Sequence, residues 1–304
     1  MEPATGFEDE KIVKIEKFDS TWTIARKKFV KNKIGMISLC LLLFIIAFSF
    51  LGPFILTDDI TRIHTDKSNL EPSSEHWFGT DRNGRDMFLR TIHGGKVSLT
   101  IGIVSMFAVT IIGSTIGAIA GYFGGMMDNL IMRFTDFVLT IPFTVFIIVL
   151  NTILLGYERV TGMWSLIIVF SLLGWGSVAR IVRSKILSEK ENEYVLAAKS
   201  IGTKSSKIIS RHLIPNVMTI IIVQATLLLA LYIVAEAGLS FIGVGVPPDT
   251  PSWGNMLMEA RQTDVLKNKP WIWVPPAVCI TLTILSINFV GEGLKDAFDP
   301  KTTK

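Results

Sequence analysis

Acidic and amide side chains stand inside long apolar runs of this 304-residue chain, among them Asp136, Gln224, Glu236, Asn288 and Glu292. Burying such groups in lipid is costly, so each is expected to face the interior of a helix bundle or an aqueous path. Gln224, Glu236 and Asn288 are the candidates for lining such a path. Glu236 is the best placed for a gate, because it is acidic and lies near the end of its run. For each residue, the alternative is interhelical hydrogen bonding or an interfacial position.

Patterns for other chemistry are missing from the sequence. There is no G-x-x-x-x-G-K-[ST] phosphate loop, and the nearest fragment, GGKVS at 94–98, has the wrong spacing. The four histidines share no helical-face spacing of the kind that metal ligands need, and no nucleophile elbow is present. The sequence predicts no catalytic residue, metal or cofactor for this chain, and no site of its own for ATP.

One polar, basic stretch, EYVLAAKSIGTKSSKIISRHLIPNV at 193–217, interrupts the apolar pattern. Tyr194, Ala197, Ala198 and Ile201 recur at helical spacing, which predicts a short helix with one small-residue face. A second short helix follows the glycine at 202, and the proline at 215 marks the next apolar run. A bent helix pair with a shallow face is suited to docking into another protein. The alternative is an ordinary basic loop.

The apolar runs themselves set the fold class. The run 34–56 contains no ionisable group and would reach roughly 34 Å as a helix, enough to span a bilayer. Five similar runs follow near 97–121, 134–155, 162–182, 217–246 and 271–294. We therefore expect an all-α polytopic membrane protein with six transmembrane helices, of which the last five form a core over 97–294.

Lys and Arg counted in the flanks predict the orientation, because cationic loops resist translocation. With the N-terminus in the cytoplasm, the inside segments hold 20 of the 30 Lys and Arg residues. This places segment 1–33, loop 183–216 and tail 295–304 in the cytoplasm, and loop 57–96 outside. The net charge of +4 follows from this topology, and nucleic-acid binding is a poor explanation for it.

Three further segments carry local predictions. Turn residues around 79–84 are followed by an amphipathic pattern that predicts a short helix lying on the membrane within 57–96. Glycines at 113, 117 and 121 repeat every four residues, which favours an interior packing helix over a dimerisation face. The IPF sequence at 141–143 predicts a kink, and 246–262 predicts a re-entrant or interfacial cap over the bundle.

The stretch at 193–217 resembles the EAA loop of ABC importer permeases. The family pattern is Glu-Ala-Ala, three residues, Gly, then a gap ending in Ile-x-Leu-Pro. Ala197, Ala198, Gly202 and Pro215 fall in place. The sequence departs from this pattern at three positions, with Leu196 in place of Glu, His212 in place of Ile and Ile214 in place of Leu. Glu193, nearly one turn earlier, is the nearest substitute for the missing acid.

Two more segments indicate which subgroup of these permeases the chain resembles. HWFGTDRNGRD at 76–86 and AEAGLSFIGVGVPPDTPSWGNML at 235–257 are similar to C-type permease subunits of dipeptide and oligopeptide importers. The resemblance covers roughly residues 20 to 300 and implies the type I ABC importer fold in the plasma membrane of a prokaryote. Importers of nickel, metallophores and glutathione share this subunit type, so they remain alternative substrate classes.

The resemblance also implies a larger machine. A second homologous permease, two ABC ATPase subunits that bind ATP and Mg, and an extracytoplasmic substrate-binding protein would join this chain. Its EAA-like loop would then transmit ATPase closure to the bundle. The residues expected to take part in that coupling are Glu193, Tyr194, Ala197, Ala198, Lys199, Gly202, Arg211 and Pro215.

Three other functions compete with this interpretation. A secondary transporter or channel would need a charged site at mid-membrane and no docking loop. A membrane scaffold without transport would have no use for polar residues in several spans. A membrane-embedded enzyme would need an intramembrane catalytic constellation, and the sequence has none.

Overall fold

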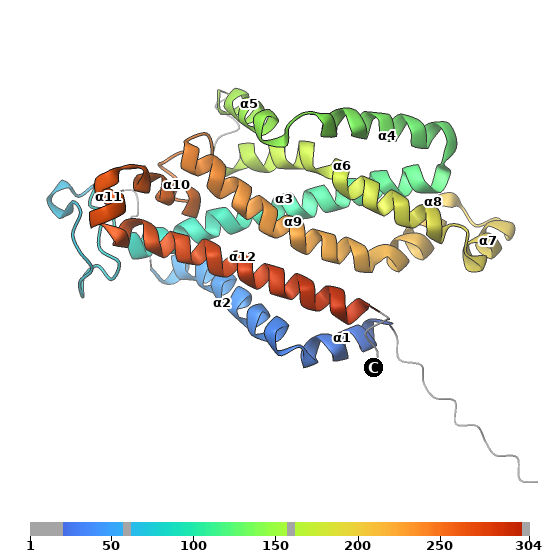
Figure 1. Cartoon of the computed structure of the whole chain (residues 1–304), viewed down its shortest axis with the longest axis horizontal. Coiled ribbons are helices and arrows are strands. Elements are labelled where there is room, and N and C mark those ends of the chain that lie inside the picture. Colours follow the sequence, from blue (N-terminus) through green and yellow to red (C-terminus); the bar gives the residue numbers. More distant parts are fainter. Residues whose placement is uncertain (1–20, 57–61, 157–161, 300–304) are drawn as a thin grey trace, which may run out of the picture.

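The computed structural model describes residues 21–56, 62–156 and 162–299, and these residues are almost entirely helical (Figure 1). The expected terminal segments 1–33 and 295–304 lie partly outside the described residues, which omit 1–20 and 300–304. In chain order the helices are α1 (Thr21–Lys31), α2 (Lys33–Ile55), α3 (Met87–Phe123), α4 (Gly125–Thr140), α5 (Phe143–Leu155), α6 (Met163–Glu189), α7 (Glu193–Ser200), α8 (Ser205–Ile208), α9 (Ile214–Ile242), α10 (Trp253–Met258), α11 (Thr263–Asn268) and α12 (Pro270–Phe298).

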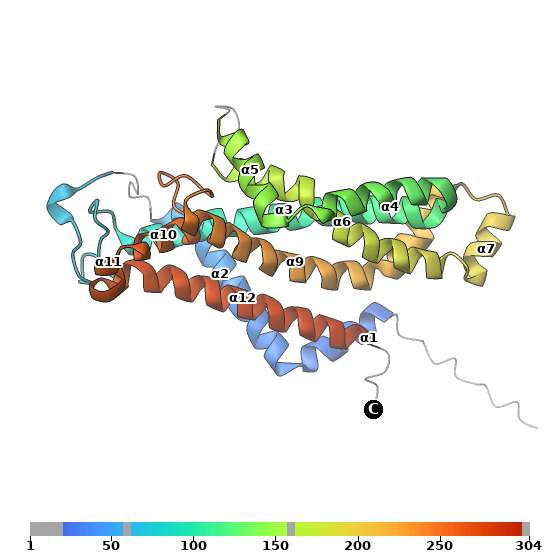
Figure 2. The same cartoon turned by 45° about the horizontal axis from the view of Figure 1, so that its top comes forward.

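Five elements of the described chain are single helices long and apolar enough to cross a membrane: α2, α3, α6, α9 with the short helices before it, and α12. A sixth apolar element is the bent pair α4 and α5. These elements match the six runs expected from the sequence. The long helices and α4 lie roughly along one axis, and α5 points away from it, with α7 and α8 at one end of the bundle and α10 and α11 at the other (Figures 1 and 2).

The bend between α4 and α5 is sharper than a kink, because the two axes meet at 84°. Ile141 leaves the helix in an extended conformation, and Pro142 follows it directly. Proline disfavours a helical conformation in the residue before it, which explains the break. Asn151 then ties α5 to the chain after α9, because its Nδ2 donates to the carbonyl oxygen of Val244 at 2.6 Å.

The prediction of a separate short helix lying on the membrane within 57–96 is wrong. Residues 87–96 form the first turns of α3, which continues without a break to Phe123. Gly94 and Gly95 precede the apolar run expected at 97–121, and they lie inside this helix. A Cβ at Gly94 would stand 3.2 Å from the backbone of Trp253, so the glycines allow other elements to approach α3 closely.

The glycine row of α3 packs against α6 within this chain. A Cβ on Gly113 would stand 2.6 Å from Cβ of Val178, and one on Gly117 would overlap the carbonyl oxygen of Ala179. Gly121 meets the backbone of Arg183 in the same way. The row is therefore an interior packing surface, as expected from the sequence, and the two helix backbones approach closely from Gly113 to Gly121, over roughly two turns.

The described ends of the chain meet each other. Trp22 on α1 packs edge-on against Phe298 on α12, with ring centroids 5.2 Å apart. Lys28 donates from Nζ to the carbonyl oxygen of Asp299 at 3.2 Å. Figures 1 and 2 place this pairing away from α10 and α11, so both described ends lie toward the same end of the bundle.

The close contact between α3 and α6 along the glycine row, which we call the α3–α6 seam, predicts that two glycine substitutions have opposite effects on stability. Gly117→Ala forces a methyl group into the α6 backbone and should destabilise the fold by about 1–3 kcal/mol. Gly238→Ala, on an open face of α9 with no atom within 4 Å of the new methyl, should be neutral or stabilising by up to about 1 kcal/mol. Thermal unfolding in detergent would compare them. Equal melting temperatures for the two variants would contradict the close packing of α3 against α6.

Candidate functional site

Two surfaces at opposite ends of the bundle carry the features that the sequence singled out. The first, which we call the Gly202 loop, comprises residues 190–213 and connects α6 to α9. The second, which we call the Trp253 cap, comprises residues 246–268 and connects α9 to α12. Figure 1 places α7 and α8 of the Gly202 loop at one tip and α10 and α11 of the Trp253 cap at the other.

The Gly202 loop has the bent helix pair expected from the sequence. Helix α7 ends at Ser200, and Gly202 adopts a φ of +76°, a left-handed conformation that glycine accepts at little cost. Helix α8 begins at Ser205 and passes into a π-helical turn at Ile209–Leu213. Pro215 lies at the start of α9, where its missing N–H interrupts the helical hydrogen-bond ladder beside that turn.

Tyr194 fixes α7 to the two long helices on either side of the loop. Its hydroxyl donates to Oε2 of Glu189 on α6 at 2.9 Å and accepts from Nδ2 of Asn216 on α9 at 2.6 Å. Burial raises the pKa of the Tyr194 hydroxyl, which favours the protonated form that donates to Glu189. Tyr194 therefore positions the loop in addition to lying on its surface.

Ala198 lies elsewhere than the sequence suggested. It faces inward with Val195, and both belong to the same buried cluster as Ile208 and Leu213. The predicted small-residue face therefore loses Ala198, because burying Val195 requires α7 to turn its adjacent side inward. Glu193, Ala197, Lys199, Gly202, Arg211 and Pro215 are all exposed.

The exposed side of α7 and the residue that follows the helix carry two apolar side chains. Leu196 is 51% exposed and Ile201 is 82% exposed. Together with Ala197, Ser200 and Gly202 they form a surface that we call the α7 face. Sequence reasoning treated Leu196 only as a departure from a family pattern. The sequence signal was the occurrence of two apolar residues, Leu196 and Ile201, on a short polar and basic stretch.

Ion pairs and caps hold the base of the Gly202 loop to the bundle. Lys190 donates from Nζ to the carbonyl oxygen of Gly121 at the end of α3, at 3.0 Å. Arg183 on α6 makes a two-pronged ion pair with the buried Asp128 on α4. Such paired geometry is stronger than a single contact, so Lys190 fixes the base of the loop to α3 while Arg183 fixes α6 to α4.

The Trp253 cap is anchored by a fully buried indole. Trp253 is 1% exposed, and its Nε1 donates to the carbonyl oxygen of Thr91 on α3 at 2.9 Å. Ser252 and Asn255 form a reciprocal capping box at the start of α10. A Cβ on Gly254 would stand 2.6 Å from Cα of Ala237, so the cap lies directly on α9. The expected cap at 246–262 is therefore an ordered element packed on the bundle.

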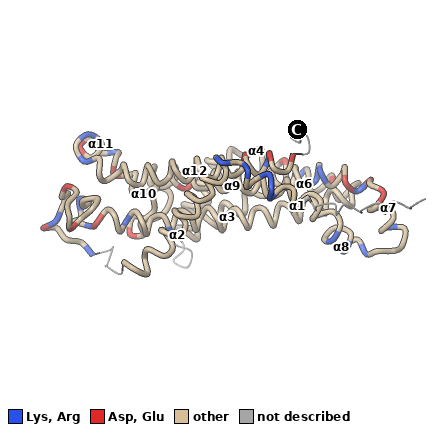
Figure 3. Tube along the Cα trace, turned by 90° about the horizontal axis from the view of Figure 1, so that it is seen from below, with Lys and Arg blue, Asp and Glu red and all other residues tan. Residues whose placement is uncertain are grey.

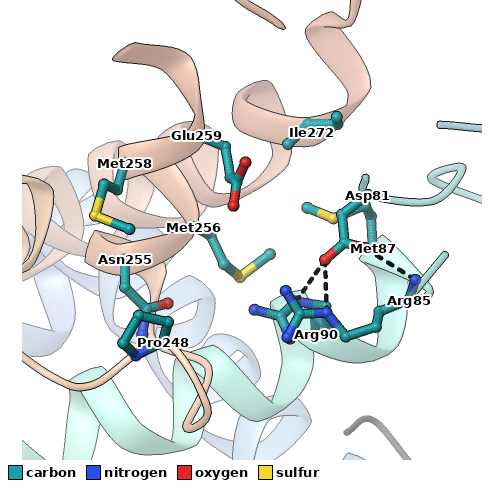
Figure 4. Close-up of a pocket in the computed structure, with 10 residues that line it drawn as sticks. All are labelled: Asp81, Arg85, Met87, Arg90, Pro248, Asn255, Met256, Met258, Glu259 and Ile272. Carbon is teal, nitrogen blue, oxygen red and sulfur yellow. Dashed lines mark hydrogen bonds and ion pairs between the residues drawn. The ribbon is translucent and has the colours of Figure 1, made fainter. Parts of the chain in front are cut away.

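A charged cluster lies beside the cap (Figure 4). Asp81 accepts from Nε of Arg85 at 2.7 Å, and the same oxygen lies 3.7 Å from Nε of Arg90. These side chains, with Asn255 and Glu259, line a cavity of about 20 Å³. That is room for about one water molecule, so the cavity is too small for a ligand pocket, and the ion pairs of the cluster join Asp81 to Arg85 and to Arg90 on α3.

The candidate path residues do not form one lining. Gln224 is half-buried on α9, Asn288 is exposed on α12, and Glu236 is completely buried near the end of α9. Glu292 is exposed on α12, and Asp136 pairs with Arg180 between α4 and α6. Asn151 on α5, fully buried and bonded to Val244, was missed by sequence reasoning. It could have been found by the rule applied to Gln224, because it is an amide inside an apolar run.

Comparison with known proteins defines the class of this bundle. Residues 113–304 match the model of the family described as binding-protein-dependent transport system inner membrane component, and residues 20–72 match the N-terminal TM domain of oligopeptide transport permease C. The fold resembles a solved structure of the MetNI methionine ABC transporter in an inward-facing conformation, with a TM-score of 0.56 and 17% identity over 70% of this chain and 98% of that one.

Curated relatives match over most of their length. The chain is 36% identical to the oligopeptide transport system permease protein OppC of Bacillus subtilis over 99% of this chain and 96% of that protein. It is 39% identical to the dipeptide transport system permease protein DppC of the same organism over 91% and 85%. It is also 39% identical to OppC of Haemophilus influenzae over 93% and 89%.

The class is therefore a multi-pass membrane permease with the type I ABC importer fold, and the plasma membrane of a prokaryote is its location. The chain belongs to the family of binding-protein-dependent transport system inner membrane components, among the C-type permeases of the dipeptide and oligopeptide group.

The Tyr194 bridge predicts that Tyr194→Phe loosens α7 while leaving the bundle intact. The variant loses two hydrogen bonds, each worth about 1 kcal/mol. Hydrogen exchange over residues 193–200 should therefore accelerate about tenfold. Tyr122→Phe is the matched control, because the Tyr122 hydroxyl makes only a long 3.4 Å contact with Ser205. Unchanged exchange in Tyr194→Phe would contradict the bridge.

Proposed function

We propose that this chain is a permease subunit of an ATP-driven importer for di- and oligopeptides, and that the Gly202 loop receives the motion of an ATPase. In this function it binds no nucleotide and performs no catalysis. It forms half of a translocation path, while ATP and Mg are bound by partner ATPase subunits. The observation that carries the proposal is the α7 face, an exposed apolar surface at the tip of a membrane bundle.

The α7 face supports docking by its shape and chemistry. Leu196 and Ile201 are exposed, and α7 lies at the tip of the bundle, beyond the long apolar helices (Figure 1), so a protein partner and not lipid is the expected cover for this surface. Ala197 and Gly202 keep the surface between them shallow. Lys199 and Arg211 are exposed nearby as rim charges, which would favour an acidic margin on the partner.

Charge supports a cytoplasmic position for this end. Lys and Arg lie along α1 and around α8 (Figure 3), and the described chain ends lie toward the same end of the bundle. Positive charge is retained on the cytoplasmic side of membrane proteins. Both termini and the Gly202 loop are therefore assigned to the cytoplasm, and the Trp253 cap to the outside.

Exposed polar groups on α12 support a second permease subunit. Asn288 and Glu292 are exposed in this single chain although they lie in an apolar spanning helix. Facing lipid would be costly for an amide and a carboxylate. A homologous subunit or a water-filled path between the two subunits would cover them. Asn288 and the half-buried Gln224 are therefore retained as candidate path residues.

Peptides are the proposed substrate because the curated relatives are named for dipeptide and oligopeptide transport. The complete importer would then also contain an extracytoplasmic substrate-binding protein, which would dock on the side of the Trp253 cap. Nickel, metallophore or glutathione import by the same machinery is the alternative within this class. A secondary transporter is disfavoured by the docking surface, which a gradient-driven carrier would not need.

The direct test is uptake of labelled di- and oligopeptides into vesicles that hold this chain with its partner subunits, with and without internal ATP. Peptide uptake that requires ATP is the expected result. Uptake of nickel or glutathione in place of peptides would replace the substrate class. Uptake that does not depend on ATP would overturn the importer function and favour a secondary transporter.

The α7 face also predicts the effect of added volume. Ala197→Trp should reduce both co-purification of the ATPase and ATP-dependent uptake by at least tenfold, because a packed interface tolerates extra atoms poorly. Ala197 is preferable to the buried Ala198 for this test, since tryptophan at 198 would also disrupt the loop itself. Ile37→Trp, at an exposed apolar position on α2 outside the Gly202 loop, is the control and should leave both properties unchanged. Normal uptake by Ala197→Trp would contradict the docking surface.

A further inference from the structure

A buried carboxylate joins three elements near the Trp253 cap. Glu236 on α9 is completely buried, although it lies one helical turn before Ser240 at the end of an apolar helix. Its Oε2 accepts from the hydroxyl of Ser98 on α3 at 2.7 Å, and its Oε1 accepts from the hydroxyl of Ser240 at 2.8 Å. We call these three residues the Glu236 cluster.

Each serine of the cluster also accepts a hydrogen bond from the backbone of the cap or of the chain leading into it. The hydroxyl of Ser98 accepts from the backbone N–H of Trp253 at 3.1 Å, and the hydroxyl of Ser240 accepts from the backbone N–H of Val246 at 3.1 Å. A serine hydroxyl has one hydrogen to donate and two lone pairs to accept. Because both hydrogens point at Glu236, the lone pairs are left for the two cap amides. The carboxylate therefore determines how both serines are oriented.

The two backbone amides that donate to the cluster lie at separate points of the chain. Val246 stands just after α9 ends, and Trp253 is the first residue of α10. Between them the chain makes the turn that carries Pro247 and Pro248. The cluster thus holds both ends of this turn, one through α9 and the other through α3.

The residues around these hydrogen bonds are closely packed. Gly245 lies against Ser240 so closely that any Cβ would overlap its hydroxyl, and Gly254 packs on Ala237 and Ser240. Hydrogen bonds in a dry, packed site are electrostatically stronger than the same bonds in water. The cap is therefore expected to follow α3 and α9 as one body when these helices move.

We propose that Glu236 is a positioning residue that clamps the Trp253 cap to α3 and α9, and that it sets the relation between the cap surface and the bundle. This role differs from that of a path residue, because the side chain is enclosed by serines and cap backbone. The clamp itself follows from the contacts. Its consequence for transport rests on the importer function proposed above, in which a substrate-binding protein meets the cap side.

The clamp can be tested by hydrogen exchange on the assembled complex in lipid nanodiscs. Glu236→Ala removes the common acceptor, and Ser98→Ala removes one arm with a smaller change in volume. Both should accelerate exchange over residues 246–256 at least tenfold, and Glu236→Gln, which keeps one acceptor oxygen, should fall between these variants and the wild type. Thr100→Val is the matched control, because the Thr100 hydroxyl bonds only to its own helix at Lys96.

Exchange over 246–256 that stays at the wild-type rate in both Glu236→Ala and Ser98→Ala would overturn the clamp. Ser98→Ala also keeps the test decisive if Glu236→Ala does not fold. Exchange in the Thr100→Val control should match the wild type, and faster exchange there would overturn the assignment to Glu236.

A second measurement separates positioning from simple structural support. The concentration of substrate-binding protein that gives half-maximal ATPase stimulation should rise about tenfold in Ser98→Ala, with the basal ATPase rate unchanged. Faster exchange with an unchanged half-maximal concentration would overturn the positioning role. A wild-type complex that no binding protein stimulates would overturn the importer function instead, and the exchange experiment would still decide the clamp.

Discussion

The close packing of α3 against α6 is the constraint on which the rest of the structure depends. Gly113, Gly117 and Gly121 remove every side chain from one stripe of α3, so that the backbones of the two helices touch. Without a hydrophobic driving force between helices in lipid, such contact is a main source of association. The seam makes α3 a rigid rod of 37 residues that runs from the Trp253 cap toward the Gly202 loop.

Polar groups complete this frame at both ends of the bundle. Near the cap, Trp253 bonds to the backbone of α3, and Glu236 orients the serines that hold the cap amides. Near the loop, Tyr194 bridges α6 and α9, and Lys190 closes the last turn of α3. Since unsatisfied polar groups are expensive in an apolar setting, these bonds specify one arrangement of the helices. The same long helices thus link a proposed ATPase-docking surface to a proposed outer surface.

Much of the fold could be predicted from the sequence because apolar runs of spanning length leave few alternatives. The six runs, the break at Pro142 and the bend at Gly202 follow from local chemistry. The continuity of α3 through Gly94 and Gly95 could not be predicted, since glycines that serve packing look like turn residues until their neighbours are known. Likewise Ala198 has the same small side chain whether it faces a partner or the bundle. Glu236 shows the limit most clearly, because the sequence reveals a carboxylate in an apolar run but not the distant Ser98 that binds it.

Contact between the α7 face and an ATPase subunit is the central claim of this account. The most direct measurement places a photoreactive benzophenone amino acid at position 197 of the assembled complex and identifies the subunit to which it crosslinks. We expect crosslinks to the ATPase at position 197 that change in yield when ATP is hydrolysed, and far fewer from the same amino acid at position 206. Crosslinks only to lipid or to another permease chain would contradict the assignment of the Gly202 loop as the coupling surface.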